Sequence, residues 1–178
     1  MVGLAIMSAI VVVLQLLGSF IHLGPVSISL VLVPIVVGAA IYGPTAGAVL
    51  GFVFSIVVLC QPDTSFFYGI SIFGTAITVL VKGSLAGWLS GVVYNAVSKK
   101  KRLFAVLLAA MVCPIVNTGI FALGCRLFFW TKFNELGGGD AVKFLFTVMI
   151  GFNFFAELAT NLICSPAIVR VLRAIEKN

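Results

Sequence analysis

The residues of this chain that could do chemistry are a few polar side chains inside long apolar stretches. Lys82 lies midway along one stretch, Asn117 lies midway along the next, and Arg126 follows about two and a half helical turns later. An ammonium or guanidinium group in such a place can hold an anion, while a carboxamide can orient it through directional hydrogen bonds. These residue types predict the binding of a polar, acidic small molecule.

A second group of polar side chains recurs every four residues near the carboxyl end. With this spacing, Asn153, Glu157 and Asn161 line one face of a helix. One interpretation pairs Glu157 with Lys82 as a buried ion pair, and the asparagines then bridge helices. In the other, Lys82 or Arg126 meets an acidic substrate and the asparagines fix its orientation. The two are compatible, because Glu157 can hold Lys82 until a substrate replaces it.

The sequence offers no set of residues for catalysis, a metal or a cofactor. It has one His, no paired carboxylates and no phosphate-binding G-x-x-x-x-G-K-[ST] loop, so we expect neither an enzyme nor a chain that hydrolyses ATP by itself. The four cysteines are widely spaced in apolar surroundings, which favours simple packing over a disulfide or a metal site. They are Cys60, Cys113, Cys125 and Cys164.

The elements that must position these groups follow from the composition. The chain has 178 residues, of which 62% are hydrophobic and only 9% are charged, with a mean hydropathy of +1.26. Soluble domains carry about 25% charged residues, so the composition predicts a membrane protein throughout. At about 20 residues per crossing, the length accommodates roughly six helices in one domain, residues 1–178.

Prolines and glycines divide the apolar sequence into six predicted transmembrane helices, which together form an all-α bundle. Basic residues gather at 99–102 and after the last helix, which places both termini in the cytoplasm. The net charge of +6 therefore sets the orientation in the cell membrane and does not indicate nucleic-acid binding. The predicted spans are residues 2–20, 28–42, 45–60, 68–97, 103–130 and 142–173.

Small residues at four-residue intervals predict close contacts between helices. Hydrophobic burial gives little drive for helix association in lipid, so close backbone approach matters there. We expect two glycine ladders to serve packing within the bundle, whereas Ala5 and Ala9 on the first helix equally suit a partner that slides against it. The ladders are Gly43, Gly47 and Gly51, and Gly83, Gly87 and Gly91.

Four short motifs follow one another in order along the predicted helices. They are Ala5-x-x-x-Ala9, LVPIV at 32–36, YGPTAG at 42–47, and KGSLAG at 82–87 before the basic junction. Their order and spacing in a six-span chain resemble those of the substrate-binding S component of energy-coupling factor (ECF) vitamin transporters. The resemblance covers nearly the whole chain.

This resemblance implies a subunit, embedded in membrane lipid, that captures a vitamin from outside in a pocket formed by the last three spans. Ala5 and Ala9 then dock on a transmembrane coupling protein joined to two cytoplasmic ATPases, and the loaded subunit topples to deliver its cargo. The polar side chains within the apolar spans are the predicted substrate-binding residues: Lys82, Asn117, Arg126, Asn153, Glu157 and Asn161.

Well inside the predicted spans lie two cationic side chains, Lys82 and Arg126, and one acidic side chain, Glu157. This excess of positive charge favours a substrate with a carboxylate or phosphate. Pantothenate is therefore the first choice, with riboflavin and folate next and with biotin or thiamine behind them. The main alternative is a self-sufficient, proton-coupled secondary transporter of a small organic acid, in which Glu157 and Lys82 relay protons. A third reading, an intramembrane enzyme, lacks a nucleophile, a base and metal ligands.

Overall fold

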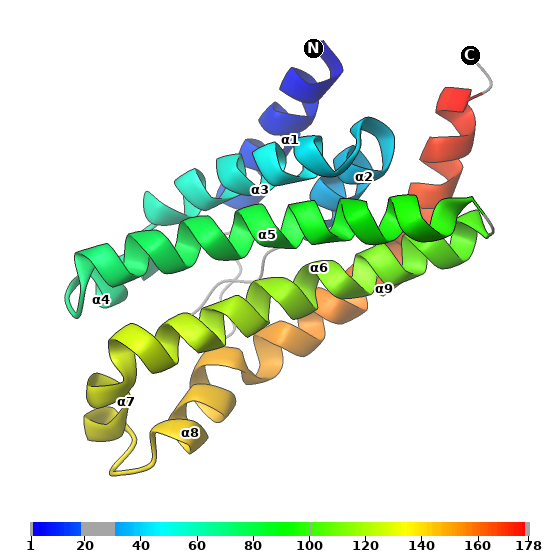
Figure 1. Ribbon diagram of the computed structural model, residues 1–178. Helices are drawn as coiled ribbons and strands as arrows, with labels where there is room; N and C mark the ends of the chain where they lie inside the picture. The colour runs from blue at the N-terminus through cyan, green and yellow to red at the C-terminus, as the bar shows by residue number, and fades with distance from the viewer. Residues whose placement is uncertain (1, 19–30, 100, 177–178) are drawn as a thin grey trace.

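The computed structural model describes residues 2–18, 31–99 and 101–176, and these residues are almost entirely helical (Figure 1). No strand occurs in these ranges, so the all-α prediction is confirmed. The helices follow the predicted apolar segments, with short extra turns at one end of the bundle. They are α1 (Val2–Gly18), α2 (Leu32–Tyr42), α3 (Pro44–Leu59), the 3-10 turn η1 (Pro62–Thr64), α4 (Ser65–Tyr68), α5 (Ile72–Ser98), α6 (Arg102–Gly124), the π-helical η2 (Cys125–Phe129), α7 (Trp130–Leu136), α8 (Ala141–Phe144), the π-helical η3 (Leu145–Ile150) and α9 (Gly151–Glu176).

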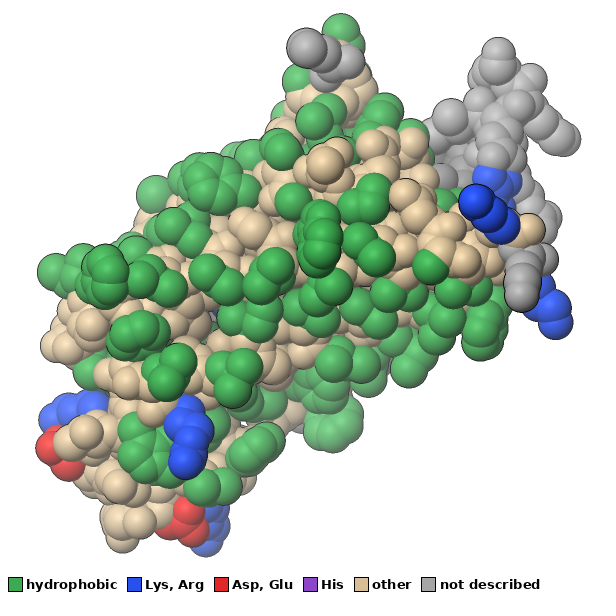
Figure 2. Space-filling view, viewed as in Figure 1, with side chains coloured by type: hydrophobic (Ala, Val, Ile, Leu, Met, Phe, Trp, Pro, Cys, Tyr) green, Lys and Arg blue, Asp and Glu red, His purple; other side chains and the backbone are tan. Residues whose placement is uncertain are grey.

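Two helices of the described chain are long and apolar enough to cross a membrane. They are α5 and the continuous helix Arg102–Leu136, and α3 with Pro62–Tyr68, a pair bent by 75°, is a third candidate. The helices α1 and α2 are apolar but shorter. The count of six crossings and the cytoplasmic location of both termini therefore stay predictions. Figure 2 shows hydrophobic side chains along the bundle and charged ones gathered at its two ends, as expected where the middle lies in lipid.

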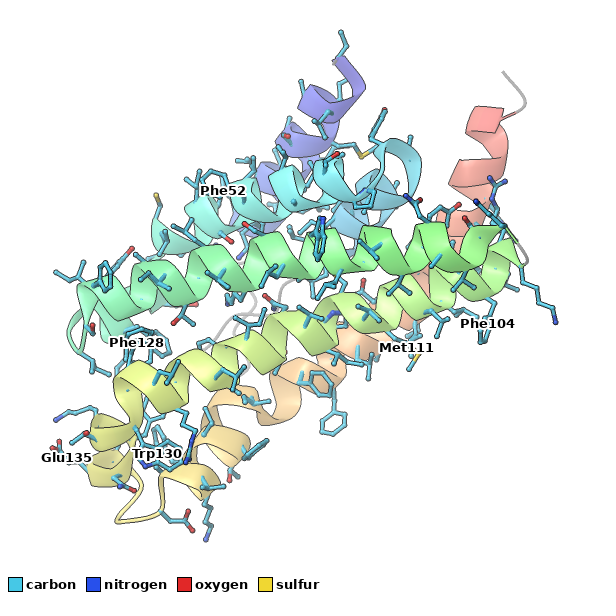
Figure 3. All side chains as sticks on the ribbon, in the orientation of Figure 1. Phe52, Phe104, Met111, Phe128, Trp130 and Glu135 are labelled. Carbon is cyan, nitrogen blue, oxygen red and sulfur yellow. The ribbon has the colours of Figure 1, made fainter. Side chains whose placement is uncertain are left out.

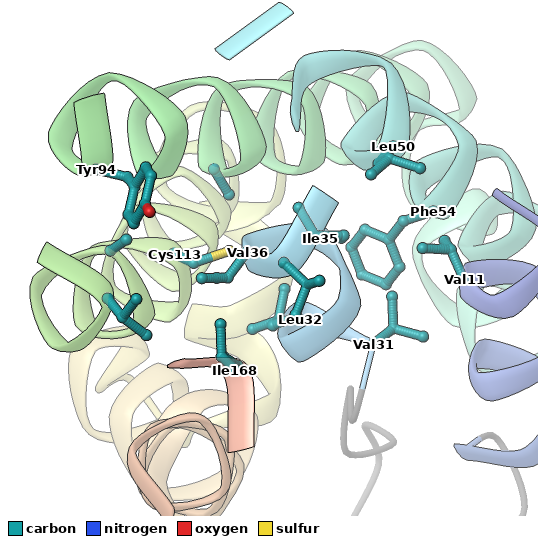
Figure 4. Close-up of a cluster of buried hydrophobic side chains, with 14 of the residues drawn as sticks. Val11, Val31, Leu32, Ile35, Val36, Leu50, Phe54, Tyr94, Cys113 and Ile168 are labelled. Atoms are coloured by element: carbon teal, nitrogen blue, oxygen red, sulfur yellow. The ribbon is translucent and has the colours of Figure 1, made fainter. Parts of the chain in front are cut away.

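The short helix α2 lies at the centre of the bundle, and most of its residues are buried. Its side chains Leu32, Ile35 and Val36 are 0% exposed and form one cluster with residues of α1, α3, α5, α6 and α9 (Figure 4). At about 1.5 Å per residue, α2 covers only about half of the hydrocarbon thickness. Gly43, with φ of +92°, ends the helix, and Pro44 begins α3 immediately. This helix therefore serves mainly as the core on which the longer helices pack.

The helices α3 and α5 cross at close range because glycines face glycines. A Cβ atom on Gly51 would overlap the backbone carbonyl of Gly83, and one on Gly47 would overlap that of Gly87. A Cβ atom on Gly91 would come within 2.6 Å of the backbone at the start of α3. The prediction that the ladders pack helices within the bundle is confirmed for these five glycines.

We expect Gly87→Ile to lower the free energy of unfolding in detergent by about 1–3 kcal/mol, the usual range for overpacking. The new side chain would meet the backbone of α3, which cannot move aside as a flexible side chain can. Gly119→Ile on α6 is the matched control, because a Cβ atom there meets nothing within 4 Å. Thermal denaturation compares the two variants, and equal stability would contradict a role for the glycine contact.

The segment 131–140, which the predicted spans 103–130 and 142–173 leave as a connecting loop, is helical over about half its length. Helix α7 covers Trp130–Leu136, and Phe133 within it is fully buried. The loop prediction was wrong there because the glycines at 137–139 and the nearby charges obscured this narrow apolar face. The two π-helical segments η2 and η3 contribute to the same buried cluster, around Phe129. Such widened turns are frequent at functional sites, so this end of the bundle is of interest.

Candidate functional site

Lys82 extends from α5 toward α6 and holds its ammonium group over an aromatic ring. Its Nζ atom is 5.0 Å from the centroid of the Phe121 ring, which is a cation–π distance. Phe121 also meets Phe67 of α4 edge-on, with ring centroids 5.6 Å apart. The short helix α4 is thereby connected, through one pair of rings, to the cation of the candidate site.

Glu157 places a negative charge near this cation. Its side chain is buried on α9, and its carboxylate is within electrostatic range of Lys82 on α5 and of Cys113 on α6. The three helices α5, α6 and α9 therefore converge on one charged region of the interior. The structure brings together the two residues of opposite charge that lie far apart in the sequence.

Two buried asparagines lie close to these groups along their helices. Asn117 lies on α6 one turn before Phe121, and Asn161 lies on α9 one turn after Glu157. The Nδ2 atom of Asn161 donates a hydrogen bond to the backbone carbonyl of Glu157 at 2.9 Å. Among the described residues, the Oδ1 atoms of both asparagines have no hydrogen-bond partner. Buried oxygens without a donor are uncommon in proteins and can accept hydrogen bonds from a ligand.

Arg126 does not share this interior region. It lies in η2, is exposed, and its guanidinium carbon is 4.9 Å from the centroid of the Trp130 ring, at the α7 end of the bundle (Figure 3). The side chain of Asn153 lies outside the described residues. Four of the predicted substrate-binding residues therefore lie between α5, α6 and α9: Lys82, Asn117, Glu157 and Asn161.

Most of the chain matches a known protein family. The family model described as ECF transporter, substrate-specific component, matches residues 1–169. The chain belongs to this family. The resemblance expected from the sequence motifs is thus confirmed, and neither the curated proteins nor the solved structures gave a match.

A substrate-specific component is a membrane transport subunit and not an enzyme. Its family membership implies a small-molecule substrate and a partner ECF module, which consists of a transmembrane coupling protein and ATPases. The location of the substrate site stays a prediction, and the polar groups on α5, α6 and α9 are its candidates.

The small-residue face of α1 is open in this substrate-specific component. Ala5 and Ala9 are exposed, as are the neighbouring Ile6 and Ile10. Beside α1 lies a mostly apolar groove of about 290 Å³, and neither Lys82 nor Glu157 lines it. It is lined by Leu4, Tyr42, Thr45, Ala46 and Val49. A smooth apolar surface of this kind suits contact with another membrane helix, and its docking role stays a prediction.

Two glutamines that the sequence analysis did not single out tie α1 to the bend after α3. The Nε2 atom of Gln15 donates to Oε1 of Gln61 at 3.0 Å, and Nε2 of Gln61 donates to the backbone carbonyl of Gln15 at 3.0 Å. Both side chains are buried. Gln61 directly precedes η1 and α4, the segment that carries Phe67. A glutamine inside the mostly apolar first helix was a signal in the sequence. The sequence did not show that its partner lies 46 residues away.

We expect Gln61→Leu to destabilise the chain by about 1–3 kcal/mol, because the polar groups of Gln15 then stay buried with fewer partners. The double variant Gln15→Leu with Gln61→Leu should lose less free energy of unfolding than the two single variants lose in sum, because both side-chain partners are removed together. Chemical denaturation of the four proteins measures this coupling. Additive losses would show that the two amides do not depend on each other.

Proposed function

We propose that this chain is the high-affinity substrate-capture subunit of an ECF-type importer for a vitamin or related micronutrient in the bacterial cell membrane. Pantothenate is the leading candidate, followed by riboflavin and folate. The chain binds its substrate and passes it across the membrane together with the coupling protein and two cytoplasmic ATPases.

The position of Lys82 is the observation that carries this proposal. An ammonium group at membrane depth is costly, and Lys82 is kept there by the ring of Phe121 at 5.0 Å and by the nearby charge of Glu157. Because Arg126 lies on the exposed side of η2, the case for an acidic substrate rests on Lys82. A substrate carboxylate would form a charge-assisted hydrogen bond with its Nζ atom, a stronger contact than one between neutral groups.

Substrate capture then proceeds by exchange of partners within the interior. Glu157 balances the charge of Lys82 while the subunit is empty, which avoids an isolated buried cation. An arriving carboxylate takes over Lys82, and the carboxamides of Asn117 and Asn161 orient the rest of the molecule. The ring of Phe67 on Phe121 covers this region from the side of α4.

The closeness of Lys82 and Glu157 also favours the second candidate function, a proton-coupled secondary transporter of a small organic acid. Paired ionisable groups inside a membrane protein are a common arrangement for proton transfer. This alternative requires the chain to accumulate substrate without an ATPase.

Reconstitution into vesicles separates the two functions. The purified chain alone should bind labelled pantothenate tightly but accumulate none inside vesicles under a proton gradient. Addition of the ECF module and ATP should produce accumulation. Uptake by the chain alone under a proton gradient would overturn the proposal in favour of the secondary transporter. Native mass spectrometry of the gently purified chain would identify a retained substrate directly.

A further inference from the structure

Three buried side-chain oxygens on the helices of the candidate site lack a hydrogen-bond partner in the described part of the chain. They are Thr78 Oγ1, Asn117 Oδ1 and Asn161 Oδ1. These side chains are 5% exposed or less. A buried polar atom without a partner is destabilising, because its lost contacts with water are not replaced. Three such atoms on adjoining helices therefore require an explanation.

Each of these oxygens lies one helical turn from a residue of the charged region. Residues four apart share a helix face, so the oxygens are directed to the same side of their helices as the charged region. The pairs are Thr78 with Lys82, Asn117 with Phe121, and Asn161 with Glu157. The interior that holds the charges therefore also holds three oxygens that can accept hydrogen bonds from a ligand.

The two asparagines are the better candidates for contact with a ligand. Gly124, the last residue of α6, packs directly on Thr78. A Cβ atom added to Gly124 would overlap the threonine side chain. The hydrogen bond from Nδ2 of Asn161 to the Glu157 carbonyl fixes the orientation of the asparagine side chain. Its Oδ1 atom therefore stays available to accept a hydrogen bond from a ligand. The 5% exposed Asn117 carries the second free oxygen, on the facing helix α6.

We infer that the substrate is a carboxylate that also carries hydroxyl or N–H groups, which donate to Asn117 Oδ1 and Asn161 Oδ1 while the carboxylate faces Lys82. The inference rests on the proposed function and narrows its substrate class. Lys82 supplies donors to the anion, whereas the asparagine oxygens need donors from the ligand. A carboxylate without any donor of its own would leave both oxygens unpaired and would bind weakly.

A matched set of acids tests this class on the wild-type chain. Pantothenate has a carboxylate, two hydroxyls and an amide N–H, whereas ionised nicotinate and lipoate have a carboxylate and no donor. Calorimetry on the purified chain should show pantothenate binding at least about a hundredfold more tightly than either donor-free acid, because sites built for a hydroxyl or N–H group reject analogues that lack it. Equal or tighter binding of nicotinate or lipoate would overturn the inference.

Substitution of the acceptor gives a second and independent readout. Asn117→Leu should weaken pantothenate binding about tenfold, the usual effect of one lost hydrogen bond. The ligand-free variant should unfold at the same temperature as the wild type or higher, because an unpaired buried oxygen is gone. Asn95→Leu is the matched control, since Asn95 is exposed on α5 and should alter neither quantity.

The outcomes distinguish the inference from the proposed function. If Asn117→Leu bound pantothenate as tightly as the wild type, the inference would be wrong but the proposed function would stand. The same holds if ligand-free Asn117→Leu unfolded at a lower temperature than the wild type, because Asn117 would then stabilise the fold. Failure of the wild-type chain to bind pantothenate, nicotinate, lipoate or folate would overturn the proposed capture of an acidic vitamin, and the inference with it.

Discussion

Replacement of Ala5 and Ala9 by tryptophan is expected to abolish substrate uptake by the assembled transporter and to leave substrate binding unchanged. The exposed face of α1 is small and apolar at these two positions. Helices in a membrane approach closely only where small residues meet, so two indoles would hold the coupling protein's helices apart. Helix α1 packs mainly on α3 and α2 rather than on the helices that carry Lys82, Asn117 and Asn161, so affinity for the substrate should not change.

Two measurements check this prediction on the same preparation. Uptake is followed in vesicles that contain the ECF module and ATP, and binding is followed by calorimetry on the purified subunit. Ala96→Trp on α5 is the matched control, because Ala96 is likewise exposed but lies outside α1. Normal uptake by the α1 variant would contradict the docking role, and loss of binding would show that α1 supports the site itself.

The parts of the fold that depend on local sequence were predictable. Apolar runs between prolines located the helices, because each apolar segment must satisfy its own backbone hydrogen bonds inside lipid. The four-residue spacing of Gly47, Gly51, Gly83 and Gly87 predicted close packing, which the α3–α5 crossing confirms. The sequence did not reveal which helices would cross, since that depends on contacts between distant segments.

The candidate site was predictable only in part. The depth of Arg126 along its helix suggested a place in the interior. Arg126 follows Asn117 by nine positions, however, and nine positions correspond to about two and a half helical turns. Helical geometry thus directs the two side chains to opposite faces, and the π-helical turn of η2 shifts the register further. The spacing itself held this information, whereas the approach of Glu157 to Lys82 required the tertiary structure.

Lys82→Met should weaken the binding of pantothenate by about 1–3 kcal/mol, or roughly 5- to 150-fold, through loss of a charge-assisted hydrogen bond. Methionine keeps much of the side-chain length while it removes the charge. The single change also removes the positive charge near the buried Glu157, and breaking such a pair can itself destabilise the chain by about 3–5 kcal/mol.

The double variant Lys82→Met with Glu157→Gln removes both charges together and should therefore be more stable than Lys82→Met alone. It should still bind pantothenate weakly, because no cation faces the carboxylate. Glu157→Gln alone should bind pantothenate as tightly as the wild type or more tightly, since Lys82 no longer has a competing anion. Calorimetry on the three variants, with folding checked by circular dichroism, measures both effects. If the folded double variant bound pantothenate like the wild type, Lys82 would serve only to balance Glu157, and the acid-binding role of the interior would be wrong.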